Sequence, residues 1–180
     1  EMLRSLVGSE MCIRDRPTRV HRPNVLSTIY DQMKTDGHKP STEVLSYGTS
    51  PASQEVSLKL EVSPGTNVTT IRRLRMSDRQ PAGLMFDMIR SSIAPAATAL
   101  ERDSFENALA ERGVVVTMAR QAVSARKASA PEAQLLRIPA GSTMLSIQNI
   151  SYDESGKIAA YGEYLFRADR FALKNTLFAH

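Results

Sequence analysis

The sequence predicts an α+β domain in which a mostly antiparallel sheet carries a few helices. Runs rich in β-branched residues outnumber helical patterns, and short turns rich in Gly, Pro, Ser and Asp join neighbouring runs. One pattern from the first half of the chain returns in the second half, which predicts an internally duplicated domain. The 180 residues are enough for one such domain with a core of its own.

The first predicted hairpin covers residues 67–90. Its arms, NVTTIRRLRM and AGLMFDMI, flank the turn sequence SDRQP. Residues two apart on a strand share a face, so Arg73 and Arg75 should point to one side of the sheet, while Arg72 and Leu74 point to the other. Two guanidinium groups side by side form a candidate anion site. From the spacing alone, two such arginines more often form a solvated face or pair with Asp and Glu side chains.

The second predicted hairpin repeats the apolar positions of the first at a constant offset. The recurring residues are Leu60, Val62, Gly65, Val68, Ile71 and Leu74, which return as Leu136, Ile138, Gly141, Met144, Ile147 and Ile150. Each copy is expected to form a short helix, a turn, a strand, a tight turn and a second strand. Arg73 and Arg75 correspond to Asn149 and Ser151, so the first copy is the expected anion binder.

Before the first hairpin we expect a helix over 24–35, a strand over 41–47 and a short helix over 51–60. Asn24 is the candidate cap of the first helix, and Gly37 is its stop. The later elements follow in order: a short turn or helical piece at 95–100, a helix at 104–112, a strand at 114–125, a helix at 131–136, and strands at 143–152, 158–166 and 171–178. We expect the strand at 114–125 in the centre of the sheet and the last strand at its edge.

The start of the chain is expected to be foreign to the protein. Residues 6–16, LVGSEMCIRDR, are what one frame of a DNA string resembling a transposon-based sequencing adapter encodes. We therefore interpret 1–16 as a sequencing scar. The only cysteine, Cys12, falls inside it, so neither disulfides nor thiol chemistry are expected. Residues 17–23 are locally basic and are interpreted as a linker from a missing N-terminal domain, with 24–180 as the domain itself.

Charge and hydropathy narrow the functional classes and cellular locations that are expected for the chain. The net charge is +4 and the pI is near 9.4, but the positive residues are scattered, and residues 17–180 show neither a helix-turn-helix pattern nor a basic helix. Direct DNA binding by this chain is therefore the weakest hypothesis. No apolar run approaches the roughly 20 residues that a membrane helix needs. A chain without a signal segment, and with its cysteine confined to 1–16, is expected in the cytoplasm.

Several stretches in a fixed order carry a family resemblance. They are Met33 with Gly37, IRRLRMSDRQP, LLRIPAGSTML and SYDESGKIAAYGEYLFRADRF. Together they resemble the effector-binding UTRA domain of HutC-type GntR-family transcription regulators, over essentially all of 17–180. The resemblance implies a chorismate-lyase-like fold, homodimerisation and a preceding winged helix-turn-helix domain. It also implies that a small anionic metabolite, such as a sugar phosphate, phosphonate or carboxylic acid, binds here and modulates DNA binding by that preceding domain.

The resemblance further implies a set of ligand-binding residues. Arg73 and Arg75 match residues that hold the anionic group in sugar-phosphate-sensing members, Thr117 matches a Ser or Thr near the ligand, and Tyr161 belongs to one of the best-matching motifs. Met85 is included, although it and Ala160 stand where many members have glutamates, which makes a hydroxyl-rich ligand less expected. The plainer interpretations are a strand threonine, a half-buried sheet tyrosine and a core methionine.

Three functional hypotheses stay open. The first is an anion sensor without chemistry of its own. The second is a chorismate-lyase-like enzyme that grips substrate carboxylates, although no nucleophile motif or metal-ligand cluster is present and the histidines stand at 21, 38 and 180. The third is a dimerisation module that binds no ligand. We expect no catalytic residue, no metal and no cofactor, and we interpret Arg167, Asp169 and Arg170 as a structural ion-pair network.

Overall fold

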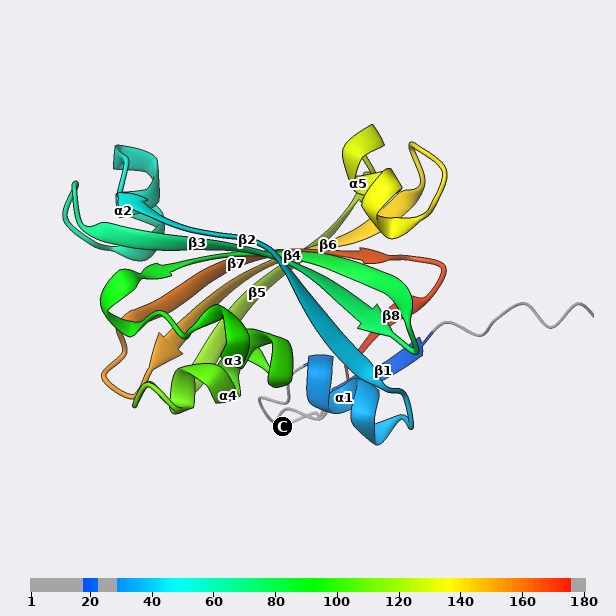
Figure 1. Cartoon of the computed structure of the whole chain (residues 1–180), viewed down its shortest axis with the longest axis horizontal. Coiled ribbons are helices and arrows are strands. Elements are labelled where there is room, and N and C mark those ends of the chain that lie inside the picture. The colour runs from blue at the N-terminus through cyan, green and yellow to red at the C-terminus, as the bar shows by residue number, and fades with distance from the viewer. Residues whose placement is uncertain (1–17, 23–28, 176–180) are drawn as a thin grey trace, which may run out of the picture.

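The computed structural model describes residues 18–22 and 29–175. The proposed scar at 1–16, the Asn24 cap and the end of the strand expected at 171–178 lie outside the described residues. The described part consists of one large sheet with helices on both faces, and a separate pair of short strands (Figure 1).

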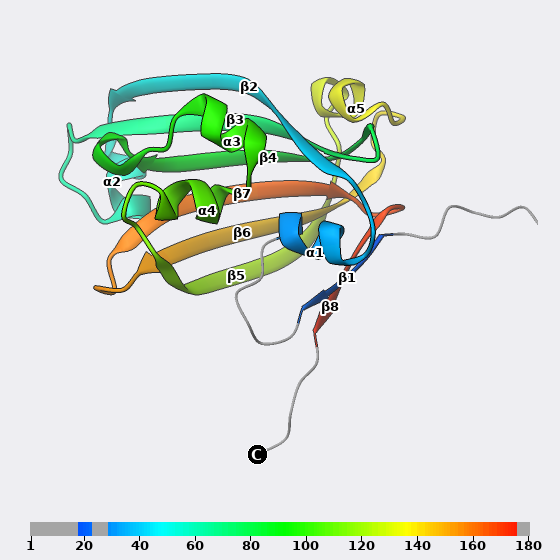
Figure 2. The ribbon, with the colours of Figure 1, turned by 60° about the horizontal axis from the view of Figure 1, so that its bottom comes forward.

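A six-stranded sheet forms the centre of the domain. Its strand order is β2-β3-β4-β7-β6-β5, and every neighbouring pair is antiparallel (Figure 2). The strands are β2 (Pro40–Pro51), β3 (Asn67–Ser77), β4 (Gln80–Arg90), β5 (Val116–Lys127), β6 (Thr143–Asp153) and β7 (Ile158–Arg167). The two halves of the chain meet where β4 pairs with β7. This arrangement confirms the predicted α+β class with a mostly antiparallel sheet.

The helices are divided between the two faces of the sheet. On one face, α2 (Gln54–Leu60) and α5 (Ala130–Leu136) stand at opposite ends of the strands (Figure 1). The other face is covered by α1 (Ile29–Thr35), α3 (Ala97–Arg102) and α4 (Phe105–Ala110), and the turn η1 (Ser91–Ile93) leads from β4 towards α3. We call these the α2/α5 face and the α1/α3/α4 face. Buried apolar clusters lie on both faces, so the sheet separates two layers of core.

Serine side chains fix the start of three short helices. Ser53, Ser104 and Ser129 are N-caps, and each accepts a hydrogen bond from the backbone N–H three residues on. Ser129 forms a complete capping box with Glu132. These helices have only six or seven residues, so packing against the sheet, more than helix propensity, must hold them in place.

The first predicted hairpin is confirmed. β3 and β4 pair from the Val68–Arg90 end to a two-residue turn, where Asp78 and Arg79 both have positive φ, 50° and 65°. Paired positive φ values are typical of tight hairpin turns, because their twist matches that of the strands. The predicted facing is also confirmed, since Arg73 and Arg75 are buried on one face, while Arg72, just before them, is exposed on the other.

Two strands do not lie where the sequence predicts them. β5 is the outermost strand of the described sheet rather than a central one, and its Met118 and Val123 are 50% and 45% exposed. The apolar start of this segment, Val114 and Val116, packs against the helical cluster around α4 instead of against a second neighbouring strand. Its apolar character therefore reflects contact with helices and not a central position.

The final strand also differs from its prediction. β8 (Phe171–Asn175) pairs in parallel with β1 (Thr18–Arg22) in a separate two-stranded sheet, and does not extend the edge of the large sheet. The rings of Phe166 and Phe171 stack with their centroids 4.3 Å apart, which packs the start of β8 against the same core cluster as the end of β7. β1 lies within the segment that we interpret as a linker.

Both halves of the chain have the same order of elements. β2, α2, β3 and β4 of the first half are matched by β5, α5, β6 and β7 of the second. α2 and α5 also end alike, in left-handed residues, Glu61 at φ 51° and Arg137 at φ 53°. The order is consistent with an internal duplication, which stays a prediction.

Candidate functional site

Two buried arginines dominate the α1/α3/α4 face of the sheet. The side chains of Arg73 and Arg75 are 0% and 2% exposed, and both project from the same face of β3. This face is the one that α1, α3 and α4 cover (Figure 2). An ionised group is costly to bury unless charges and hydrogen bonds compensate it. The partners of these two guanidinium groups therefore indicate what the site can bind.

Arg73 is compensated by an acid. Its Nη2 donates to Oδ2 of Asp87 on β4 at 2.6 Å, and both side chains are 0% exposed. Tyr164 on β7 donates its hydroxyl to the other Asp87 oxygen at 3.0 Å, and the Phe105 ring lies 4.8 Å from Arg73 Cζ. Burial opposes the positive charge, but Asp87 and Tyr164 outweigh burial and raise the pKa of Arg73. Arg73 therefore stays charged.

Arg75 has weaker compensation. Its Nη1 donates to the hydroxyl of Thr42 at 2.6 Å, and the ring of Tyr30 lies 4.7 Å from its Cζ. Burial, followed by repulsion from Arg73, lowers the pKa of Arg75 to about 10. Its neighbours are thus mainly neutral groups, and the site carries positive charge that Asp87 alone does not balance.

Several donors of this pair have no acceptor. Nε and Nη1 of Arg73 and Nε of Arg75 are buried and have no hydrogen-bond partner in the described part of the chain. A second acid, Glu106 near the start of α4, lies close enough to interact with both arginines, but burial raises its pKa and so disfavours its charged form. Because buried donors without acceptors are rare in native proteins, these nitrogens make the pair a candidate anion site.

Tyr164 reaches Asp87 by lying across Gly162. Gly162 is the direct partner of Asp87 in the β4–β7 ladder, and a Cβ at this position would collide with the hydroxyl and ring of Tyr164. The missing side chain thus makes room for the phenol to cross towards the neighbouring strand. Burial raises the pKa of Tyr164 well above its ordinary value, so its hydroxyl remains a donor to Asp87.

A strip of buried polar side chains continues from the arginine pair across the sheet. In register, Asp87 pairs with Gly162, Gly162 with Asn149 and Asn149 with Gln121. Asn149 donates to the Ser151 hydroxyl at 2.9 Å and accepts from Gln121 at 2.8 Å, and both Asn149 and Ser151 are buried. The strip offers amide and hydroxyl groups beside the charged end of the site.

The structure brings together only part of the set of ligand residues that the family resemblance implies. Met85 is buried on the same face as Arg73, its partner in the β3–β4 ladder. Tyr161 lies on the α2/α5 face, where it packs beneath Lys59 of α2. Thr117 is exposed on β5, four strands from β3 and thus roughly 19 Å away, and donates to the Asp153 carbonyl at 3.2 Å.

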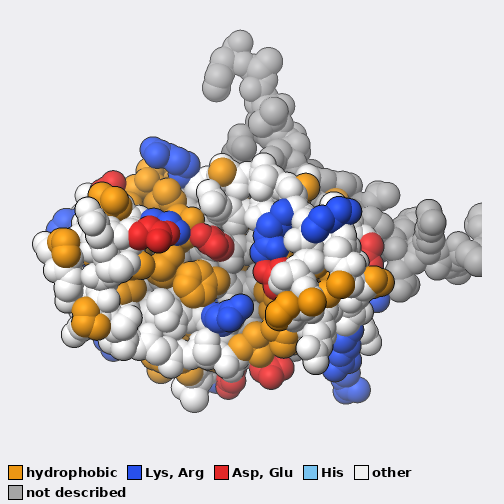
Figure 3. Space-filling view, turned by 90° about the horizontal axis from the view of Figure 1, so that it is seen from above, with side chains coloured by type: hydrophobic (Ala, Val, Ile, Leu, Met, Phe, Trp, Pro, Cys, Tyr) orange, Lys and Arg blue, Asp and Glu red, His pale blue; other side chains and the backbone are white. Residues whose placement is uncertain are grey.

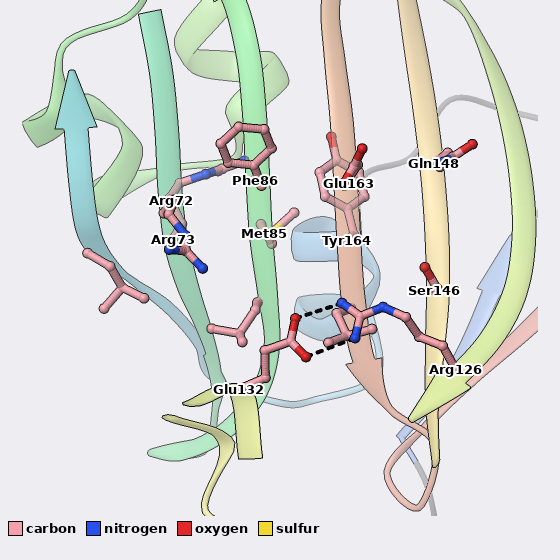
Figure 4. A pocket seen from close by; sticks show the side chains of 13 residues that line it. Arg72, Arg73, Met85, Phe86, Arg126, Glu132, Ser146, Gln148, Glu163 and Tyr164 are labelled. Carbon is pink, nitrogen blue, oxygen red and sulfur yellow. Dashed lines mark hydrogen bonds and ion pairs between the residues drawn. The ribbon is translucent and has the colours of Figure 1, made fainter. Parts of the chain in front are cut away.

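A groove on the α2/α5 face is the alternative candidate site. It has a volume of about 440 Å³, and its lining includes Arg72, Phe86 and Glu163 (Figures 3 and 4). At one end Arg126 and Glu132 form a two-bond ion pair of 2.8 and 2.7 Å, which lowers the pKa of Glu132 to about 2. Because Arg126 is already paired with Glu132, it offers an anion less unbalanced positive charge than the buried arginine pair does.

Sequence reasoning missed several residues of the arginine site. Asp87, Tyr30 and Phe105 compensate or cover the two guanidinium groups, yet they come from three different elements. Asp87 carried the one usable signal, since it is a lone acid in an otherwise apolar strand that would share the face of Met85. The predicted ion pair near the end of the chain is confirmed between Arg167 and Asp169, at 2.7 Å.

Metal-binding clusters and membrane-spanning helices are both absent from the described residues. Within 18–22 and 29–175 there is no group of three or more His, Cys, Asp or Glu side chains suited to a metal ion. Among the helices of these same ranges, none is long and apolar enough to span a membrane.

Comparison with known proteins links this geometry to a family. The model of the UTRA domain family matches residues 35–172. The HTH-type transcriptional regulator Rv0792c of Mycobacterium tuberculosis is 30% identical over 156 residues, which cover 83% of this chain and 57% of that protein. The chain thus spans little more than half the length of this relative.

Solved structures show the same fold. The effector domain of PhnF from Mycobacterium smegmatis superposes with a TM-score of 0.80 at 20% identity, covering 89% of this chain and all, 100%, of that one. A GntR-family transcriptional regulator from Enterococcus faecalis superposes with a TM-score of 0.68 at 26% identity, covering 74% of this chain and 98% of that one.

Proposed function

The chain belongs to the UTRA domain family, the effector domain of GntR-family transcription regulators, and from this premise we propose that it senses a small anionic metabolite. In this proposal the ligand binds at Arg73 and Arg75 and modulates DNA binding by a winged helix-turn-helix domain that precedes residue 24. Residues 17–23 are the linker, and the full-length protein is a homodimer. Rv0792c, the sequence relative compared above, is named a transcriptional regulator, which supports a regulatory role rather than a catalytic one.

The observation that carries the proposal is the unbalanced charge of the buried arginine pair. Asp87 compensates Arg73, whereas Arg75 depends on a threonine hydroxyl and an aromatic ring. Three buried guanidinium nitrogens lack acceptors among the described residues. An oxyanion would supply both the missing negative charge and the missing acceptors, and charge-assisted bonds to guanidinium groups are the stronger kind.

The surroundings narrow the ligand class. A phosphate, phosphonate or carboxylate group would occupy the arginine pair. The amide and hydroxyl groups of Asn149 and Ser151 would then meet a polar remainder of the ligand. Met85 offers an apolar contact where a glutamate would favour sugar hydroxyls. We therefore place phosphonates, small phosphate esters and carboxylic acids ahead of hydroxyl-rich sugars.

Regulation requires that the ligand bind two domain arrangements with different affinities. We propose that the occupied state holds the preceding DNA-binding domains in a position that does not fit DNA, so that the ligand acts as an inducer. A full-length protein that binds its operator more tightly with ligand present would reverse this sign.

The experiment is a thermal melt of the chain against a panel of inorganic phosphate, sugar phosphates, phosphonates and small carboxylic acids. A compound that binds only the folded state, at about 100 times its dissociation constant, should add roughly 2.7 kcal/mol of stability. Arg75→Met should abolish the effect of any such compound. Arg72→Met is the matched control, because it changes the neighbouring residue on the opposite face of the same strand.

Two results would contradict the proposal. One is stabilisation that survives Arg75→Met but is lost in Arg72→Met, which would place the ligand in the groove on the α2/α5 face. The other is no stabilisation by any member of the panel, which would favour a dimerisation module without a ligand.

A further inference from the structure

Each buried arginine is covered by an aromatic ring from a different helix. Phe105 of α4 lies over Arg73, and Tyr30 of α1 lies over Arg75, with ring-to-Cζ distances of 4.8 and 4.7 Å. Phe105 belongs to an apolar cluster with Leu100, Leu109 and other residues of α3 and α4. Tyr30 is held by contacts of another kind. The cations of Arg75 and Lys34 lie against its ring, and its hydroxyl makes one hydrogen bond.

The side chain of Tyr30 connects α1 and α3, two of the helices that cover the arginine site. Its hydroxyl donates to the main-chain carbonyl of Arg102, the last residue of α3, at 3.2 Å. One ring contact is with Arg75, and Lys34, one helical turn further along α1, places its Nζ 4.4 Å from the same ring. A side chain of α1 therefore spans from the arginine with the weakest compensation to the end of α3.

The closed site leaves little space for a ligand. Arg73, Arg75, Tyr30 and Phe105 are 0%, 2%, 6% and 3% exposed. A ligand of several atoms therefore enters only if one of the two covering rings, or the helix that carries it, moves. α1 is the cover that responds to charge at Arg75, because the attraction between a guanidinium group and a ring face weakens once an anion neutralises the cation.

We propose that Tyr30 is a latch on the anion site, closed when the site is empty and released when an oxyanion binds Arg75. This inference rests on the proposed function and adds to it a route from the ligand to the N-terminal segment. Release would free the end of α1 that faces α3, while Ile29 and Met33 keep the helix anchored in the core. α1 contacts β1, which lies in the proposed linker, so a change in α1 reaches that linker (Figure 2).

The test uses the full 180-residue chain with inorganic phosphate as the probe. Hydrogen exchange of the backbone amides of α1, followed by mass spectrometry, should become faster when phosphate is added to the wild type. Tyr30→Phe removes the hydroxyl but keeps the ring over Arg75. Without phosphate, this variant should show faster exchange in α1 than the wild type, and phosphate should raise it further, because the ring contact with Arg75 remains. It should also bind phosphate roughly two- to tenfold more tightly, the range that one neutral hydrogen bond spans.

Tyr47→Phe is the matched control. The Tyr47 hydroxyl donates to the main-chain carbonyl of Pro95 at 3.1 Å, a bond of the same kind to the segment before α3, but Tyr47 makes no ring contact with an arginine among the described residues. Its exchange in α1 and its phosphate affinity should equal those of the wild type. Equal effects of the two substitutions would overturn the latch, because any lost hydroxyl near α3 would then suffice.

The remaining outcomes separate the latch from the anion site. If phosphate binds in an Arg75-dependent way but exchange in α1 does not change, the anion site stands and the latch is wrong. The latch is also wrong if Tyr30→Phe has the affinity and exchange of the wild type. If phosphate binding is absent, or is the same in Arg75→Met, the latch is overturned, while the proposed function fails only if no other member of the panel binds in an Arg75-dependent way.

Discussion

Arg73 and Asp87 form a fully buried ion pair across β3 and β4, with Arg73 Nη2 2.6 Å from Asp87 Oδ2 and neither side chain exposed. The negative charge of Asp87 is therefore compensated by Arg73 and does not compensate Arg75. Arg75, two residues along the same strand, is left with hydroxyl and ring contacts. The two arginines therefore differ in compensation, since Arg73 has an acidic partner and Arg75 does not, although both keep a buried Nε without an acceptor among the described residues.

Breaking the structural pair should cost stability. Arg73→Met would leave Asp87 buried without its cation, and losses of about 3–5 kcal/mol are typical when one partner of a buried pair is removed. We expect a loss of this size in the free energy of unfolding, measured by urea denaturation at pH 7. Arg72→Met, exposed on the same strand, should change it by less than about 0.5 kcal/mol. Equal effects of the two substitutions would contradict the assigned role of Asp87.

Removing the second arginine should have the opposite consequence for stability. Arg75→Met replaces a poorly compensated buried charge with an apolar side chain of similar length. The free energy of unfolding should stay the same or rise by about 1–2 kcal/mol, while stabilisation by anions disappears. Urea denaturation with and without phosphate measures both effects. A loss of more than about 2 kcal/mol without phosphate would show that Arg75 is structural, like Arg73.

The close approach of Tyr164 to Asp87 can be tested through Gly162. Gly162→Ala places a Cβ against the Tyr164 hydroxyl and ring, and crowding of this kind in a core typically costs about 1–3 kcal/mol. Gly48→Ala is the control, since Gly48 is also a strand glycine but a Cβ there meets nothing within 4 Å. Thermal melts should separate the two variants. If both melt as the wild type does, Tyr164 has another low-energy position and its bond to Asp87 is dispensable.

The ion pair at the start of α5 should make stability depend on pH. Arg126 lowers the pKa of Glu132 from 4.5 to about 2, so the folded state gains stability above pH 4.5 and loses it as the pH falls towards 2. Because Arg126 is 46% exposed, solvent screening reduces the gain to roughly 1 kcal/mol. Glu132→Gln should cost about that much at pH 7 and progressively less below pH 4.5.

Urea denaturation at several pH values between 7 and 3 measures this dependence. Glu154→Gln, in the exposed turn between β6 and β7, should leave the pH profile unchanged. A constant cost of Glu132→Gln across this range would mean that the helix cap, and not the charge, accounts for the loss.

Much of the fold was predictable because local rules decide it. The hairpin around Asp78 and Arg79 and the helix start at Ser104 follow from turn and cap chemistry that only a few neighbouring residues determine. The outer position of β5 was not predictable in this way. Whether Val114 and Val116 contact a strand or a helix depends on the order of strands in the sheet, which no local pattern contains.

The same distinction between local patterns and tertiary packing applies to the candidate site. The shared face of Arg73 and Arg75 follows from the two-residue period of a strand, and the structure confirms it. Their partners do not follow from any period, because Asp87, Tyr164 and Tyr30 are brought to them by strand pairing and helix packing. Thr117 and Tyr161 had equally good local signals, yet the fold places one on an outer strand and the other on the opposite face.

The Nε–Hε signals of the arginine side chains in a ¹H–¹⁵N spectrum report on the anion site itself, because Nε of Arg73 and Nε of Arg75 lack acceptors within the described chain. Titration with phosphate, or with the best compound of the panel, should shift these two signals together and saturably, with one dissociation constant. The signals of Arg72 and Arg126, which line the groove on the other face, should stay in place. Shifts confined to Arg72 and Arg126 would place the ligand in that groove and contradict an anion site on the buried arginine pair.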